Sequence, residues 1–481
     1  MNAQRCVNLY PEIDNADGKN VLALYGTPGL MLFTYIGALP IRGTHVIDGA
    51  IYAVSGSRLV KVLANGVVSN IGTLLSSSGR VSMADNGTQV MLVDGPYGYI
   101  YNTGTGVFAQ ITDPDFPGAD MVTFMDGYFV FNYPASGSFM ITSLYDGTSV
   151  DALDIATAER DPDKLTALAS DHGELWLFGE STTEVYYNSG NADFPFERIS
   201  GTVIEEGIAA RWSVAKMDNS LCWLAQGKSG KGYVVRAQGY TPQIISTRAL
   251  EYQISTYPTI ADAYAFSYTM EGHKFYVLTF PSGNATWVYD AATGMWHERS
   301  SYGVGRWRAG SYAFLNGRHY VGDYLDGDIY ELSMTAYTDR GDPIERIRAG
   351  QYVHKSNRPL VFHRLTIDME TGTGDSNYST GEFIWYRLDG TFPLDGTRKL
   401  GGDLMLGGSV NPSAMLRWSD DGGHTWSNEH WVGIGKVGEY RKQAIWNRLG
   451  RADQSRVFEL KITDPVKVTI IDAHVELTAG R

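Results

Sequence analysis

The sequence predicts an all-β protein. We expect a β-propeller of about six or seven blades, an additional C-terminal β-rich domain and an extended N-terminal arm. Glycine is abundant, at 55 of 481 residues, and aromatic residues reach 12%. Turn residues recur in front of runs rich in aromatic and β-branched side chains, which is typical of strands. Patterns with the 3.6-residue period of a helix are scarce, so strands should account for most of the chain.

Residues 1–45 are interpreted as an N-terminal arm together with the strands that lead into the propeller. The first residues, MNAQRCVNLYPEID, lack the basic-then-apolar layout of a secretory signal. Asn8, Tyr10 and Pro11 lie in this segment, which we expect to be an extended arm able to lie on a neighbouring copy or on another protein. The longest apolar stretch, residues 29–41, is interrupted by glycine and proline and is too short to span a bilayer, so no membrane-spanning segment is expected.

Residues 46–337 contain the repeat that predicts the propeller. A turn residue followed by an aromatic-rich strand recurs with spacings of 38, 40, 46, 46, 53 and 45 residues, at Gly49, Gly87, Gly127, Gly173, Asn219, Gly272 and Gly317. A period of about 45 residues is typical of four-stranded blades, and glycine or asparagine supplies the left-handed backbone of a tight turn. A glycine-rich β-sandwich is the alternative. One short helix is expected within residues 156–168.

Residues 338–346, TDRGDPIER, form a predicted linker, and residues 347–481 a predicted C-terminal β domain. This domain contains one copy of the pattern S-x-D-x-G-x-T-W, which resembles the Asp-box of sialidases and other propeller proteins. The pattern comprises Ser419, Asp421, Gly423, Thr425 and Trp426. We expect the aspartate to accept backbone hydrogen bonds across a hairpin turn, and the tryptophan to lie buried beneath it. Those roles are structural.

The charge is divided unevenly along the chain. The net charge is −14, yet residues 341–481 hold 18 basic and 18 acidic side chains, so the whole acidic excess belongs to residues 1–340. Such a surface should repel nucleic acid. Only two cysteines, Cys6 and Cys222, are present, so no disulfide framework is expected.

The sequence contains no complete catalytic or metal-binding motif of the kinds considered below. The GKS of residues 227–229 lacks the glycine of a phosphate loop, because Cys222 stands at that position. No nucleophile elbow, no H-E-x-x-H and no Cys/His cluster with metal-ligand spacing is present. We therefore expect no catalytic residue, no cofactor and no metal.

One basic cluster stands out, in residues 439–458. Its members are Arg441, Lys442, Arg448, Arg451 and Arg456, interleaved with Trp446 and Phe458. It could form a nucleic-acid patch. Because the chain as a whole is not basic, contact with a protein partner is the favoured interpretation.

Several stretches together resemble a known family. They are QRCVNLYPEI, LYGTPGL, SGRVSMADNG (78–87), STTEVYYNSGNADFPFERISGTVIEEGI (181–208), WSDDGGHTWS and the segment from GEYRKQAIW to DAHVEL. Their order along the chain is similar to that of the packaged-DNA stabilisation protein, or tail hub or nozzle protein, of short-tailed bacteriophages.

The resemblance implies a virion structural protein of the tail, made in the bacterial host cytoplasm. It implies a six-fold homo-oligomeric ring below the portal and its adaptor ring. That ring would extend the channel through which duplex DNA passes without sequence preference, hold packaged DNA in, and carry tailspikes and a tail needle. The resemblance supplies no catalytic residues. The alternative from another class is a sialidase-like glycan hydrolase or glycan-binding propeller, in which Trp287 and Trp296 could stack on sugars.

Overall fold

The computed structural model describes residues 5–14, 21–158, 163–226, 230–355, 358–371, 412–436 and 438–479. Almost all regular structure in these ranges is β-strand, and their one α-helix is α1 (Arg248–Ile254). The chain divides into two compact units. The propeller unit comprises Leu32–Trp296 and Val304–Leu332, and the sandwich unit comprises Met1–Met31, His297–Gly303 and Ser333–Arg481.

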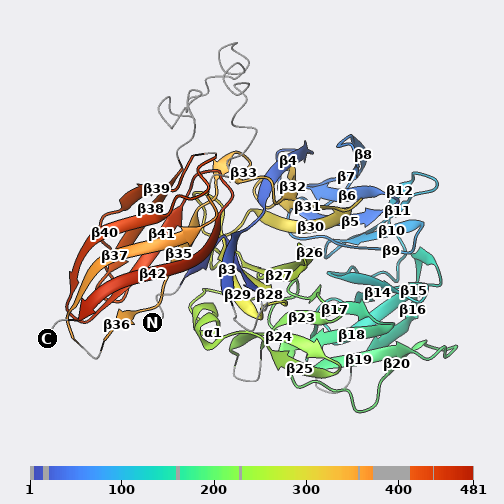
Figure 1. Cartoon of the computed structure of the whole chain (residues 1–481). Helices are drawn as coiled ribbons and strands as arrows, with labels where there is room; N and C mark the ends of the chain where they lie inside the picture. The colour runs from blue at the N-terminus through green and yellow to red at the C-terminus, as the bar shows by residue number, and fades with distance from the viewer. Residues whose placement is uncertain are drawn as a thin grey trace, which may run out of the picture. The chain divides into compact units, whose positions relative to one another are not determined.

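The described strands of the propeller unit group into seven antiparallel blades, which confirms the predicted propeller class (Figure 1). Blades one to three are β5 (Ile41–Ile47), β6 (Ala50–Ser55), β7 (Arg58–Leu63) and β8 (Val68–Thr73); β9 (Ser82–Asp85), β10 (Gln89–Val93), β11 (Gly98–Asn102) and β12 (Phe108–Gln110); and β13 (Val122–Met125), β14 (Tyr128–Asn132), β15 (Ser138–Ser143) and β16 (Asp146–Thr157).

Blades four to six continue the series. They are β17 (Leu165–Asp171), β18 (Glu174–Gly179), β19 (Thr183–Asn188) and β20 (Phe196–Arg198); β21 (Gly207–Ile208), β22 (Ala215–Lys216), β23 (Leu221–Gln226), β24 (Gly232–Gln238) and β25 (Thr241–Ile244); and β26 (Tyr264–Met270), β27 (His273–Phe280), β28 (Ala285–Asp290) and β29 (Met295–Arg299).

The seventh blade is completed by a strand from the other end of the sequence. β30 (Ala309–Leu315), β31 (Arg318–Asp323) and β32 (Asp328–Ser333) are joined by β4 (Gly29–Tyr35), which lies next to β32. Neighbouring blades contact each other from β5 through β30, and β30 in turn contacts β5, so the blades close a circle.

The seven residues that revealed the repeat occupy the same place in every blade. Each lies in the tight turn before the blade's long second strand, and each has a positive φ, between 58° and 93°. In six of the seven turns the preceding residue is also left-handed, as at Asp48, Asp126 and Asn316. Two successive left-handed residues are the signature of a type I′ hairpin turn, which explains why Gly and Asn recur there.

The sandwich unit is assembled from three separate parts of the chain. One sheet path contains β1 (Cys6–Val7), β35 (Arg346–Ala349), β41 (Ser455–Ile462), β38 (Ser413–Ser419) and β39 (His430–Gly433), with β36 (Val353–His354) on β41. The other sheet is β2 (Leu9–Asp14), β3 (Val21–Gly26), β42 (Thr469–Ala479), β37 (Leu360–Met369) and β40 (Ala444–Ala452). Leu9 and Leu24 pack in one core with Trp446, Phe458 and Ile470, so amino-terminal residues belong to this core.

Several predicted boundaries fall inside observed elements. Residues 1–45 contain β4 of blade seven and the start of β5 of blade one. The predicted linker 338–346 contains two short strands, β33 (Thr338–Asp339) and β34 (Asp342–Pro343).

The predicted helix within residues 156–168 is wrong. The described residues of that segment end β16 and begin β17, while 159–162 lie outside the described ranges. The apolar positions there pack as blade strands, and this tertiary packing overrides a weak helical pattern. The observed helix α1 starts instead after Thr247, whose side chain accepts a hydrogen bond from the backbone of Leu250.

Candidate functional site

The Asp-box turns the hairpin between β38 and β39. These strands pair from Ser413 opposite Gly433 to Leu416 opposite His430. Asp421 accepts hydrogen bonds from the Thr425 amide (2.8 Å) and hydroxyl (2.6 Å), and Ser419 Oγ accepts one from the Gly423 amide (2.7 Å). Gly423 has a φ of 95°, a conformation that side chains disfavour. Every one of these contacts holds the turn.

The hydrogen bonds from Thr425 and Ser419 hold the pKa of Asp421 well below its usual range. A carboxyl group with a lowered pKa is a poor proton donor at neutral pH. The geometry therefore supports the structural role predicted for this motif.

Trp426 departs from its prediction, because it is only partly buried. Its ring lies beneath the guanidinium of Arg417, 4.7 Å from the ring centroid, and Arg417 also pairs with Glu459. The expectation of a buried Trp426 is wrong, since a charged side chain covers the ring in place of the core.

Arg456 is a core residue and not a surface contact. Its side chain is 2% exposed, and it forms a two-bond ion pair with Asp420, at 2.6 and 2.7 Å. It also donates to the carbonyls of Leu449 and Arg451, and its guanidinium lies over the ring of Trp418. Arg456 thereby ties the Asp-box hairpin to β40, and its predicted role in partner contact is wrong.

The other four basic residues of the cluster are exposed. Lys442 pairs with Glu439 at 3.7 Å, and Arg451 pairs with Asp453 at 3.4 Å. Arg448 has a left-handed backbone, with a φ of 58°, next to a bulge in the pairing of β37 with β40. These four remain candidate contacts for a partner.

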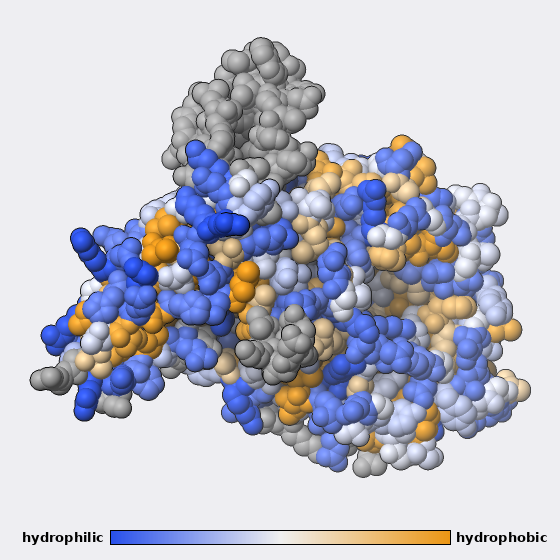
Figure 2. All heavy atoms as spheres, viewed as in Figure 1, coloured by the Kyte–Doolittle hydropathy of each residue, from blue (hydrophilic) through white to orange (hydrophobic). Residues whose placement is uncertain are grey.

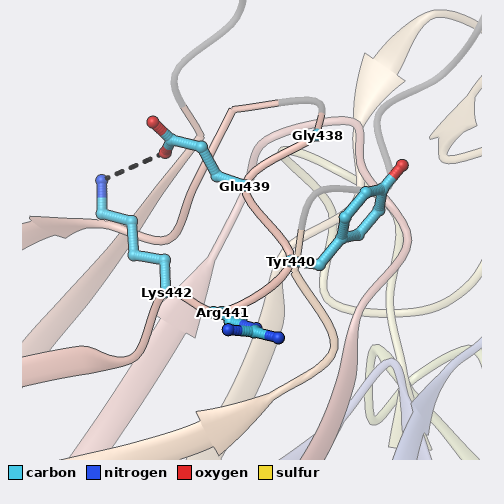
Figure 3. Close-up of a pocket in the computed structure, with 5 residues that line it drawn as sticks. All are labelled: Gly438, Glu439, Tyr440, Arg441 and Lys442. Atoms are coloured by element: carbon cyan, nitrogen blue, oxygen red, sulfur yellow. Dashed lines mark ion pairs between the residues drawn. The ribbon is translucent and has the colours of Figure 1, made fainter.

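A shallow hollow of about 530 Å³ lies at one end of this cluster, lined by Gly438, Glu439, Tyr440, Arg441 and Lys442. Figure 3 shows Tyr440 and Arg441 pointing away from the Lys442–Glu439 ion pair. Tyr440 is 69% exposed. An exposed tyrosine beside an arginine is typical of protein-binding surfaces.

Asn8, Tyr10 and Pro11 lie inside the chain's own fold. The Asn8 amide nitrogen donates to the carbonyls of Ser300 (3.0 Å) and Glu345 (2.9 Å), and its side-chain oxygen accepts from the Ser300 amide (3.1 Å). Tyr10 is buried and Pro11 pairs with Leu24 across β2 and β3. The prediction of an arm free to lie on a neighbour is therefore wrong for residues 5–14.

The two tryptophans considered for sugar stacking are engaged within the propeller unit. Trp287 donates to the Tyr257 hydroxyl (3.0 Å), and Trp296 donates to the carbonyl of Ile245 (2.7 Å). Both pack against a core cluster. The GKS of residues 227–229 lies outside the described residues.

Within the described ranges, no group of three or more His, Cys, Asp or Glu side chains is arranged to hold a metal ion. None of the helices in those ranges has the length and hydropathy that crossing a membrane requires.

Comparison with protein families gives two matches in chain order. Residues 3–337 match the family described as "Bacteriophage P22 Gp10, beta-propeller", and residues 396–478 match "Bacteriophage P22 Gp10, beta-sandwich". No curated protein matches the chain significantly.

Solved structures match this chain at low sequence identity. The N-terminal domain of Nup159 matches at 10% identity and a TM-score of 0.41, over 68% of this chain and 98% of its own. The WD40 propeller domain of Doa1 matches at 13% identity and a TM-score of 0.40, over 64% of this chain and 97% of its own. YCF48 bound to D1 peptide matches at 12% identity and a TM-score of 0.42, over 64% of this chain and 98% of its own.

Proposed function

Because this chain belongs to the bacteriophage P22 Gp10 family, we propose that it is a ring-forming tail hub, or nozzle, subunit. The membership itself identifies a phage structural protein and not an enzyme, as the sequence predicted. The proposal adds that six copies form a ring below the portal and its adaptor ring, extend the DNA channel and retain packaged DNA. The ring would also carry the tail needle and tailspikes.

The family match carries this proposal, because its two segments follow one another in the order of the propeller and C-terminal sandwich strands. The charge distribution agrees with it. A wall that DNA slides along must not bind phosphate strongly, and the acidic excess of residues 1–340 disfavours such binding. The glycan-hydrolase alternative is set aside, because Asp421 serves the hairpin turn and Trp287 and Trp296 are engaged within their own unit.

Electron microscopy of virions provides the test. Particles made without this chain should lack density below the adaptor and lose their DNA. Particles complemented with the full chain should show a six-fold ring and retain DNA. A variant with Asp193→Lys, an exposed loop position, serves as a matched control that should complement fully. A tail density with another symmetry, or DNA retained without the chain, would contradict the proposal.

A further inference from the structure

The outer strand of blade three carries an unusual bulge. Met140 of β15 pairs with Ile155 of β16, but Thr142, two residues further along, pairs with Val150, five residues away. The extra residues of β16 therefore protrude from the strand pairing. We call residues 151–154 the blade-three knob.

The knob presents an apolar tip between two carboxylates. Leu153 is 84% exposed, the highest value among the large hydrophobic side chains in the described residues. Asp151 accepts a hydrogen bond from the Leu153 amide (2.9 Å), which fixes the turn that displays the leucine. Figure 2 shows hydrophobic surface at the edge where β15 and β16 lie in Figure 1.

A bulge by itself has a simpler use, since it blunts an outer strand against edge-to-edge aggregation. That use does not require an exposed leucine, because a charged tip protects an edge better. An apolar tip with acidic flanks instead offers a partner both an apolar and a charged contact. Burial and the negative charge of Asp151 raise the pKa of Asp154, so a nearby cation would stabilise this pair of carboxylates.

The same chain offers a surface of matching chemistry. The hollow lined by residues 438–442 combines the exposed ring of Tyr440 with the guanidinium of Arg441. Arg441 is exposed, and no ion pair to it occurs among the described residues. The knob supplies an apolar tip and negative charge, and the hollow supplies an aromatic face and positive charge.

We propose that the blade-three knob of one copy docks in the hollow of a second copy, with Leu153 against Tyr440 and Asp151 or Asp154 beside Arg441. Because the two surfaces differ, each copy can use both, and a contact of this kind builds a closed ring when its rotation closes. The inference rests on the proposed ring and identifies one of its contacts.

Sedimentation velocity of the full chain over a range of concentrations tests the contact. The parent should self-associate. Leu153→Ser, Arg441→Glu and the double variant Asp151→Lys/Asp154→Lys should each weaken association by about tenfold or more. Asp193→Lys and Lys231→Glu, which change exposed charges of the propeller unit outside the knob, serve as charge-matched controls and should associate like the parent.

Combining the charge reversals of the knob and the hollow in one chain distinguishes a direct contact from general repulsion between copies. Adding Arg441→Glu to the Asp151→Lys/Asp154→Lys chain should restore association, because the knob is then basic and the hollow acidic. Neither reversed protein should associate alone, but a mixture of the two should assemble with alternating copies, because each knob then meets a hollow of opposite charge. A parent that stays monomeric, or reversals that change nothing, would overturn the proposal. Six-fold rings that persist in virions of the reversed variants would reject this contact while leaving the proposed function intact.

Discussion

The propeller unit and the sandwich unit differ in how far apart their core residues lie in the sequence. Most propeller cores are shared by two blades that follow each other in the sequence, as in the cluster that joins Tyr52 and Val54 of blade one to Leu92 and Tyr101 of blade two. The exception is the core that blade one shares with blade seven. The sandwich core joins Leu9 and Leu24 to residues beyond 360. Local pairing leaves a periodic trace in the sequence, and distant pairing leaves none. The blade repeat can therefore be recognised in the sequence, whereas the place of the amino-terminal strands in the sandwich core cannot.

The largest effect should come from deleting residues 1–14, which removes β1 and β2 from the sandwich unit. Each sheet of that unit loses a strand, and the hydrogen bonds of Asn8 are lost. We expect the sandwich unit to unfold while blades one to six persist, as shown by hydrogen exchange in β37 and β42 compared with β10 and β14. Deleting residues 1–4 alone is the control. Wild-type protection in β37 would show that the first strands are dispensable.

Arg456→Met should destabilise the sandwich unit by about 2–4 kcal/mol, because a buried guanidinium with several hydrogen bonds is removed. Arg451→Met removes a similar but exposed side chain and should change stability by less than about 0.5 kcal/mol. Chemical denaturation of both variants measures the difference. Equal losses would mean that the basic cluster acts as one surface.

Gly173→Ala should destabilise the propeller unit by about 1 kcal/mol, the cost of a left-handed alanine. Its φ is 75°, and a Cβ there would meet nothing within 4 Å, so steric clash contributes nothing. Gly173→Asn should cost less, because Asn219 already occupies the equivalent turn with a φ of 58°. Thermal melting of the two variants provides the comparison, and identical losses would argue against a backbone origin.

Asp421→Asn should produce a smaller and pH-dependent loss. The pKa of Asp421 is lowered in the folded protein, so its charged form stabilises the fold above the ordinary aspartate value of about 3.9. That contribution disappears as the pH falls through the lowered pKa. The melting temperatures of parent and variant should therefore differ at neutral pH and converge in acid. A constant gap down to the lowest pH would point to lost geometry and not lost charge.

The smallest expected signal is the binding of duplex DNA to the isolated protein. We expect the isolated protein to bind it no tighter than roughly 10⁻⁴ M at physiological salt, without sequence preference, because the acidic excess opposes phosphate binding. Fluorescence anisotropy measures this affinity. Micromolar binding that is lost in Arg441→Glu or Arg448→Glu would make the basic cluster a DNA clamp.

The blade turns and the family could be predicted from the sequence. Gly49, Gly173 and Gly317 marked blade turns because a left-handed backbone restricts the choice of residue. The burial of Arg456 could not be predicted, since it depends on Asp420 in a different hairpin. The position of Asn8 could not be predicted for the same reason, because its partners Ser300 and Glu345 lie about three hundred residues away.

The position of β4 has a consequence for the order in which the protein is completed during synthesis. Residues 29–35 leave the ribosome early, yet their partner β32 follows some three hundred residues later, and the partner of β3, β42, comes near the end of the chain. Pairings between such distant segments form slowly, while middle blades can form from neighbouring residues as they emerge. The earliest strands made are thus among the last to be paired. An unfinished or truncated chain would expose open sheet edges in both units, and cellular proteases would remove it before it could be built into a particle.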